Sequence, residues 1–301
     1  SFLKSTLIDQ WDAIIDFMVY STDDFRNRIH RLLSATDHYI YLSSARVYAD
    51  SSEPIAENSP RLLDVTTDSE YLNTDEYALA KARQEDILHG SGVANWTIVR
   101  PYITYGVKRL QLGAMEKEAW LYRALKGRKI VFSEEIAQTL TTVTHGEDVA
   151  RGICALVGKK EALGEAFHIT GAKSILWSEL LEVYLETLKS VAGNTPSVVF
   201  EDTSTFIDCH GGRYQVIYDR LYDRVFDSSK IARFVDIQSF KTPEAGLREC
   251  LNLFLKNPSF KDINWSLEGR RDRVAQQWIN FSEINSLREW AGYAKNRIKP
   301  R

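Results

Sequence analysis

Residues 39–48 have the sequence Tyr-Ile-Tyr-Leu-Ser-Ser-Ala-Arg-Val-Tyr. The apolar run over 39–42 predicts a buried β-strand, and the two serines that follow give this strand a polar carboxyl end. Further apolar runs at 13–19 and 96–99 predict two more buried strands. Together, these runs favour a protein built on a β-sheet.

Two stretches between the expected strands, 24–33 and 76–89, have the apolar spacing of helices. Short strands joined by helices imply a parallel sheet with right-handed crossovers. The sequence therefore predicts an α/β fold. Beyond about residue 171 the pattern loosens, and we expect helices over 176–191, 243–255 and 267–281 with a short strand over 198–200.

The pair Tyr77 and Lys81 lies one helical turn apart in the sequence Tyr-Ala-Leu-Ala-Lys, so both side chains share one helix face. A nearby ammonium group favours the phenolate form of a tyrosine. Such a tyrosine can exchange a proton with a substrate hydroxyl. This spacing also occurs by chance in many helices, where it is only a surface pair.

The context of the pair strengthens the functional interpretation. The strand before it ends in Ser43 and Ser44, and the strand after it ends in the sequence Arg-Pro-Tyr-Ile-Thr-Tyr-Gly over residues 100–106. Open α/β sheets bind ligands at the carboxyl ends of their strands. We therefore expect all three elements to meet at one edge of the sheet.

These motifs together resemble the extended short-chain dehydrogenases/reductases, the NAD-dependent epimerase/dehydratase family. Residues 142–151, 164–171 and 226–231 resemble further segments of that family in the same order, so the resemblance covers about residues 12–260. It implies a Rossmann-like doubly wound parallel sheet over residues 1–171. A smaller α/β substrate-binding lobe would follow over residues 172–301.

The glycine-rich turn G-x-G-x-x-G, which binds the cofactor pyrophosphate in dinucleotide folds, does not occur in the sequence. The nearest candidate, Gly90-Ser91-Gly92, follows a helix, and we interpret Gly90 as its C-cap. Residues 1–10 are helix-like and run directly into a strand. We therefore expect the sequence to begin inside the fold, without the first βαβ part.

The resemblance implies specific roles for the residues that match. Tyr77 would be the general acid/base and would also contact the cofactor. Lys81 would bind the ribose of NAD or NADP and tune Tyr77, and Ser44 would bind the reacting oxygen. Ser43 is the alternative if the register shifts by one. The nicotinamide would be lined by Pro101, Tyr102 and Ile103.

The resemblance leaves the reaction open between an epimerase and a reductase or dehydrogenase that acts on a nucleotide-activated sugar. Dehydratases of the family carry Thr-Asp-Glu where this chain has Ser44-Ala45-Arg46, which argues against a dehydratase. A substrate diphosphate needs cationic side chains. The candidates are Arg213, Arg220 and Arg224, although each could equally be an ordinary surface charge.

Composition excludes some classes of function. A formal net charge of -3 gives no global electrostatic basis for nucleic-acid binding. The three cysteines have neither metal-ligand nor disulfide spacing, which predicts reduced thiols in a cytoplasmic protein with no metal site. We find no signal peptide and no apolar run of the roughly 20 residues needed to span a membrane.

A rival hypothesis comes from a different class of protein. Some proteins of this fold, such as the chloroplast stem-loop-binding proteins, act as non-catalytic RNA-binding or scaffolding proteins, and a missing glycine-rich turn would suit such a descendant. The net charge and the retained Tyr77 and Lys81 argue against it. In the enzymatic hypothesis we expect a homodimer formed through the helix that carries Tyr77.

Overall fold

The central element of the computed structural model, which describes residues 10–193 and 195–299, is a four-stranded parallel sheet. Its order is β1 (Ile14–Asp16), β2 (Tyr39–Leu42), β3 (Trp96–Pro101) and β8 (Glu165–Ile169). The parallel sheet and the alternation of strands with helices confirm the predicted α/β fold. The expectation of a helix over residues 1–10 falls almost entirely outside the described residues.

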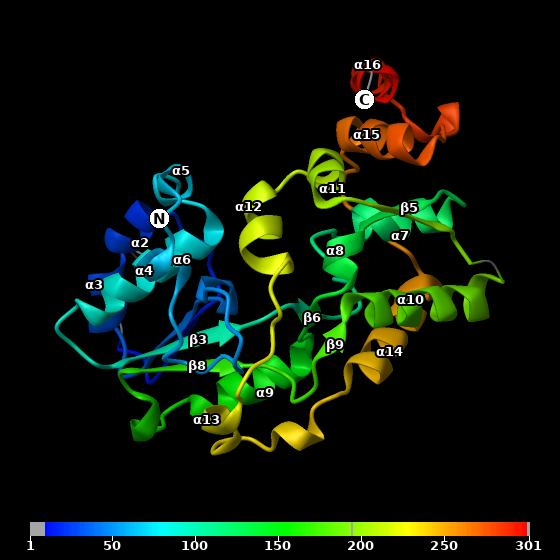
Figure 1. Cartoon of the computed structure of the whole chain (residues 1–301). Helices are drawn as coiled ribbons and strands as arrows, with labels where there is room; N and C mark the ends of the chain where they lie inside the picture. The colour runs from blue at the N-terminus through cyan, green and yellow to red at the C-terminus, as the bar shows by residue number, and fades with distance from the viewer. Residues whose placement is uncertain (1–9, 194, 300–301) are drawn as a thin grey trace. The chain divides into compact units, whose positions relative to one another are not determined.

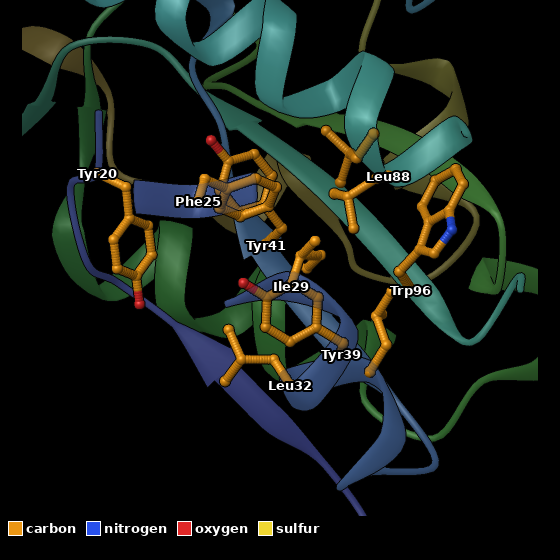
Figure 2. Packing of buried hydrophobic residues seen from close by; sticks show 10 residues of the cluster. Tyr20, Phe25, Ile29, Leu32, Tyr39, Tyr41, Leu88 and Trp96 are labelled. Carbon is orange, nitrogen blue, oxygen red and sulfur yellow. The ribbon is translucent and has the colours of Figure 1, made fainter. Parts of the chain in front are cut away.

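The strands of this sheet carry apolar side chains on both faces because alternate residues point to opposite sides. On one face, Tyr39, Tyr41 and Ile98 pack with residues of α2 (Thr22–Arg26), α3 (Ile29–Ser34) and α6 (Tyr77–His89). Figure 2 shows this cluster, with Phe25 and Ile29 close to the two tyrosine rings.

The opposite face of the sheet is covered by a second set of helices. Ile40 and Val99 pack there with Ile153 of α9 (Gly146–Leu156) and Ile231 of α13 (Ser229–Ala232). Figure 1 shows α9 and α13 on the far side of β3 and β8 from α6. Helices on both faces of a parallel sheet are the doubly wound arrangement that we predicted.

The described chain packs into two compact units that are each discontinuous in sequence. The first contains the described part of Ser1–Thr104 together with Thr142–Ser174 and Arg224–Lys241. The second contains Tyr105–Thr141, Ile175–Asp223 and the described part of Thr242–Arg301. The predicted division at residues 171/172 stays a prediction; it lies close to one of these crossings but does not include the others.

The first unit also contains shorter elements around the sheet. They are η1 (Ala45–Val47), α4 (Leu62–Val65), α5 (Ser69–Leu72), β7 (Thr144–His145), η2 (Lys160–Ala162) and η4 (Ile237–Ser239). The strand β4 (Thr104–Tyr105) lies at a crossing between the units.

The second unit combines helices with short strands. Its strands are β5 (Ile130–Ser133), β6 (Leu140–Thr141), β9 (Ile175–Leu176) and β10 (Val198–Glu201), of which β5 and β10 pair in parallel. Its helical elements are α7 (Lys117–Leu125), α8 (Glu134–Ala137), α10 (Trp177–Ala192), α11 (Thr203–His210), α12 (Arg213–Gln215), η3 (Val216–Arg220), α14 (Pro243–Lys256), α15 (Trp265–Ala275), η5 (Phe281–Glu283) and α16 (Leu287–Ile298).

A buried group of charged residues joins α7 to α15 inside the second unit. Arg123 donates to Glu268 at 2.7 Å, and Arg128 donates to the same carboxylate at 3.0 Å. Arg123 also forms an ion pair with Asp272 at 2.8 Å. Burial raises the pKa of the Glu268 carboxyl, but the surrounding arginines outweigh this and hold the pKa below its ordinary value.

Three predicted elements differ from the structure. The strand expected over 13–19 ends at Asp16, whose carboxylate accepts a hydrogen bond from the backbone of Met18, and residues 17–19 are exposed rather than buried. The helix expected over 24–33 is two helices, α2 and α3. The helix expected over 267–281 ends at Ala275 because Gln276 adopts a left-handed conformation.

Candidate functional site

The carboxyl ends of β1, β2 and β3 lie side by side in the first unit. The register pairs Asp16 with Tyr41 and Leu42 with Val99, so the three strands end at nearly the same level. Ser43 and Ser44 therefore follow β2 at the same edge at which Tyr102 and Ile103 follow β3. This is the edge at which open α/β sheets bind ligands.

Helix α6 begins at this edge with Tyr77 as its first residue. The N-cap is Glu76, whose side chain accepts a hydrogen bond from the backbone N–H of Ala78. Tyr77 is 37% exposed, whereas Tyr41 and Tyr102, which belong to the same edge, are buried. A phenol at a helix start and open to solvent can reach a substrate.

Lys81 lies one turn further along the helix, and its side chain is only 3% exposed. Its Nζ is 5.9 Å from the ring centroid of Tyr77 and 4.6 Å from that of Tyr41. The ammonium group also donates to the carbonyl oxygen of Leu42 at 2.6 Å. The predicted pair therefore shares one neighbourhood, and the lysine ties helix α6 to the end of β2.

Burial lowers the pKa of the Lys81 ammonium group to about 8, against partial compensation by the charges of Asp16 and Glu85. Among the described residues, no carboxylate lies within ion-pair distance of Lys81. A buried lysine without a bonded counter-ion costs folding free energy. Perturbed groups of this kind concentrate at functional sites.

The structure gives the two serines after β2 different surroundings. The Ser43 hydroxyl donates to the buried carboxylate of Glu85 at 2.5 Å, and Glu85 also accepts from Arg100. The Ser44 hydroxyl accepts only a local bond from the backbone of Arg46, at 3.2 Å, as the N-cap of η1. The Ser44 hydroxyl keeps its own proton to donate, which favours Ser44 over Ser43 as the reactive serine.

The segment predicted to line the nicotinamide has an unusual backbone. Pro101 is the last residue of β3, and the buried ring of Tyr102 packs 5.4 Å from that of Phe226. Ile103 has a φ of 32°, a positive value that β-branched residues rarely adopt. Because such strain persists only where surrounding structure enforces it, it is often found at ligand sites.

The three arginines predicted to bind a diphosphate are placed very differently. Arg213 is exposed at the start of α12. Arg220 is buried and donates to the carbonyl oxygen of Gly113 at 2.9 Å. Arg224 is also buried, and it donates to the carbonyl oxygens of Ala49 and Tyr48. These contacts give Arg220 and Arg224 structural roles, and their substrate role stays a prediction.

Two residues of the edge were not among the predicted site residues. The carboxylate of Asp16, at the end of β1, accepts from the hydroxyls of Tyr20 at 3.0 Å and Tyr39 at 2.7 Å. The guanidinium carbon of Arg46 lies 5.4 Å from the ring centroid of Tyr77. The sequence signal that could have indicated Asp16 is a single acidic residue inside an apolar run, here residues 13–19.

The described part of the chain contains no group of three or more His, Cys, Asp or Glu side chains that could hold a metal ion. No helix within it has both the length and the apolar character required to cross a bilayer. The three cysteines are free thiols.

Comparison with protein families gives a match over the part of the chain that carries this edge. Residues 25–170 match the model of the NAD dependent epimerase/dehydratase family. Among curated proteins, the chain is 26% identical over 180 residues to the chloroplast stem-loop binding protein of 41 kDa b from Arabidopsis thaliana. That alignment covers 60% of this chain and only 43% of the relative.

Comparison with solved structures supports the fold. A UDP-glucuronic acid 4-epimerase variant from Bacillus cereus, in complex with a fluorinated UDP-sugar and NAD, superposes with a TM-score of 0.63 at 16% identity, over 85% of this chain and 79% of the other. A dTDP-glucose 4,6-dehydratase from Bacillus anthracis in complex with NAD gives 0.62 at 17% identity, over 85% and 75%. At these identities, the likeness concerns the fold alone.

Proposed function

We propose that this chain acts on a nucleotide-activated sugar as an NAD- or NADP-dependent epimerase or reductase. Residues 25–170 belong to the NAD-dependent epimerase/dehydratase family. The observation that carries the proposal is the placement of Tyr77, Lys81 and Ser44. A solvent-open phenol begins a helix at the carboxyl edge of the sheet, with a buried ammonium group 5.9 Å from its ring.

In this proposal Tyr77 exchanges a proton with a hydroxyl of the sugar. The ammonium group of Lys81 stabilises the phenolate that forms when Tyr77 has given up its proton. The hydroxyl of Ser44 donates to the reacting sugar oxygen and holds it near the phenol. A nicotinamide cofactor, when bound, would supply the hydride acceptor and donor.

The residues that would hold the nicotinamide end of the cofactor fit that group only in part. The residues that would contact the nicotinamide end lie on α6 and at the end of β3, namely Lys81, Pro101, Tyr102 and Ile103. The strained backbone of Ile103 suits a residue that is held against a ligand. The sequence has no glycine-rich turn for the pyrophosphate. We therefore assign only the nicotinamide-ribose end to the residues of this chain.

Epimerase and reductase chemistry both remain compatible with these residues. Arg46 stands where the family's dehydratases have a carboxylate, so neither Ala45 nor Arg46 offers the acid that assists loss of water. We also propose that the protein forms a homodimer through α6. The cytoplasmic location expected from the reduced cysteines stays a prediction.

The decisive experiment compares the wild-type protein with the variant Tyr77→Phe. We expect turnover of nucleotide sugars to fall by about 10²–10⁴-fold in this variant, since a general acid/base contributes that much. Binding of the reduced cofactor, followed by nicotinamide fluorescence, should change little. The matched control is Tyr122→Phe, which removes a hydroxyl that bonds to Glu283 in the second unit. Equal turnover of Tyr77→Phe and wild type would refute the proposal.

A second candidate function is RNA binding without catalysis. It is favoured by the similarity to the Arabidopsis chloroplast stem-loop binding protein, which is 26% identical over 180 residues. A protein of this kind should bind an RNA hairpin with an affinity that falls steeply as salt increases. The net charge of -3 argues against it. Titration with an RNA hairpin at two salt concentrations separates the two candidates.

A further inference from the structure

Arg46 lies in η1, directly after the reactive edge of β2, and its guanidinium group faces Tyr77. The guanidinium carbon is 5.4 Å from the centroid of the Tyr77 ring, slightly closer than the ammonium nitrogen of Lys81 at 5.9 Å. A cation at this distance from an aromatic face is attracted to the ring. Tyr77 therefore has two cations within reach.

The position of Arg46 is fixed by Glu76, the residue immediately before Tyr77. The guanidinium donates to one carboxylate oxygen of Glu76 at 2.7 Å. The other oxygen accepts from the buried hydroxyl of Tyr71 at 3.1 Å and from the backbone of Ala78 at 2.8 Å. The carboxylate is thus held by three donors, and it holds Arg46 in turn.

The ion pair between Arg46 and Glu76 is not an ordinary surface contact. The two side chains are only 13% and 18% exposed. Exposed ion pairs contribute little because water and salt screen them, but a pair that is mostly out of water is screened much less. A purely structural pair would stabilise the start of α6 and do nothing more.

The two cations near Tyr77 differ in the pH up to which they remain charged. Lys81 faces Asp16 from β1, Tyr41 from β2 and Glu85 from its own helix. Because burial lowers its pKa to about 8, Lys81 loses its proton in mildly alkaline solution. A guanidinium keeps its charge in proteins at any such pH. Tyr77 itself lies near Arg46 and Lys81 and interacts with the Tyr41 phenol, and the carboxylate of Glu76 is bonded to Arg46.

We propose that Arg46 is a positioning residue for proton transfer by Tyr77, and that its guanidinium keeps a permanent positive charge over the phenol ring. This inference rests on the proposed function, because it assigns Arg46 a role in that reaction. Glu76 neutralises part of the charge of Arg46. We therefore expect an effect on turnover of about tenfold, which corresponds to about 1.4 kcal/mol.

The test uses the full chain with the variants Arg46→Met and Arg46→Lys. In Arg46→Met we expect kcat at neutral pH to fall about tenfold while KM changes less than about twofold. Above pH 8 the kcat of this variant should fall further, because Lys81, the other cation near the phenol, then loses its charge. The fall above pH 8 should be smaller in the wild type, because Arg46 keeps its charge when Lys81 loses its proton. The variant Arg46→Lys should restore most of the activity at neutral pH.

A matched control separates positioning from support of the fold. Arg83, on the same helix, donates to the carbonyl oxygens of Thr74 at 2.6 Å and Leu72 at 2.6 Å. The variant Arg83→Met loosens the same loop without removing a cation from Tyr77. It should lower thermal stability and leave the pH profile of kcat unchanged. If Arg46→Met has the wild-type kcat and pH profile, or changes only as Arg83→Met does, the inference is overturned.

A measurement without turnover distinguishes failure of this inference from failure of the proposed function. The ultraviolet absorbance of the phenolate of Tyr77 is obtained as the difference between a protein and its Tyr77→Phe counterpart. If the wild type turns over no nucleotide sugar, the proposed function fails, but this signal can still be compared. It should grow in at a lower pH in the wild type than in Arg46→Met, and an identical onset would overturn the inference.

Discussion

Buried positive charge is paired differently at two places in the chain, one in each unit. In the second unit, Arg123 and Arg128 share the buried carboxylates of Glu268 and Asp272. In the first unit, Lys81 is 3% exposed, yet its ammonium group is bonded to a carbonyl oxygen. Removing one partner of a buried ion pair leaves an uncompensated charge, whereas a buried charge without a bonded counter-ion is a feature that concentrates at functional sites.

The largest effect should come from breaking the paired region. The variant Glu268→Gln leaves Arg123 and Arg128 with less counter-charge in a site closed to water, and we expect a loss of about 3–5 kcal/mol in the free energy of unfolding. Urea denaturation measures it. The control, Glu186→Gln, makes the same change in an exposed pair with Arg248 and should cost less than about 1 kcal/mol. Equal costs for the two variants would remove the contrast between the regions.

The next effect concerns the buried ammonium group of Lys81, which makes the stability of the fold depend on pH. Lys81 has a pKa of about 8 in the folded protein against an ordinary value of 10.5. Between these values the unfolded chain binds the proton and the folded chain does not, so stability rises with pH across this window. The gain should be no more than about 3.5 kcal/mol, since one pKa unit corresponds to about 1.4 kcal/mol.

The variant Lys81→Met isolates this contribution from other groups that titrate at alkaline pH. It lacks the ammonium group, so the difference in stability between wild type and variant should grow in favour of the wild type from pH 8 to pH 10. The measurement is a series of urea denaturation curves at several pH values. A difference that stays constant with pH would mean that Lys81 is not destabilised by burial.

A smaller pair of effects sharpens the contrast within the first unit. Ser43→Ala removes a buried hydrogen bond to the carboxylate of Glu85 and should cost about 2 kcal/mol in stability, with activity changed less than about threefold. Ser44→Ala should cost about 0.5–1 kcal/mol as a lost cap but reduce kcat by about 10²-fold. Denaturation curves and initial rates measure the two quantities. The reverse pattern would assign the reactive hydroxyl to Ser43.

The sequence by itself determined the strand at 39–42, the helix with Tyr77 and Lys81 on one face, and the order of the motifs. These features depend on residues close together in the chain, through the periodicity of apolar side chains and the chemistry of strand ends. The same local rule failed at residues 17–19, because an apolar run does not show whether another element covers it.

Only the tertiary structure decided which polar groups of the edge are committed to packing. Ser43 bonds to Glu85, and Arg224 bonds to Tyr48, through contacts between residues distant in sequence. The burial of Lys81, the approach of Arg46 to Tyr77 and the repeated crossing of the chain between two units are likewise long-range results. Residue types and spacing set which side chains can react, whereas burial and hydrogen-bond partners, which arise from packing, select those that remain available.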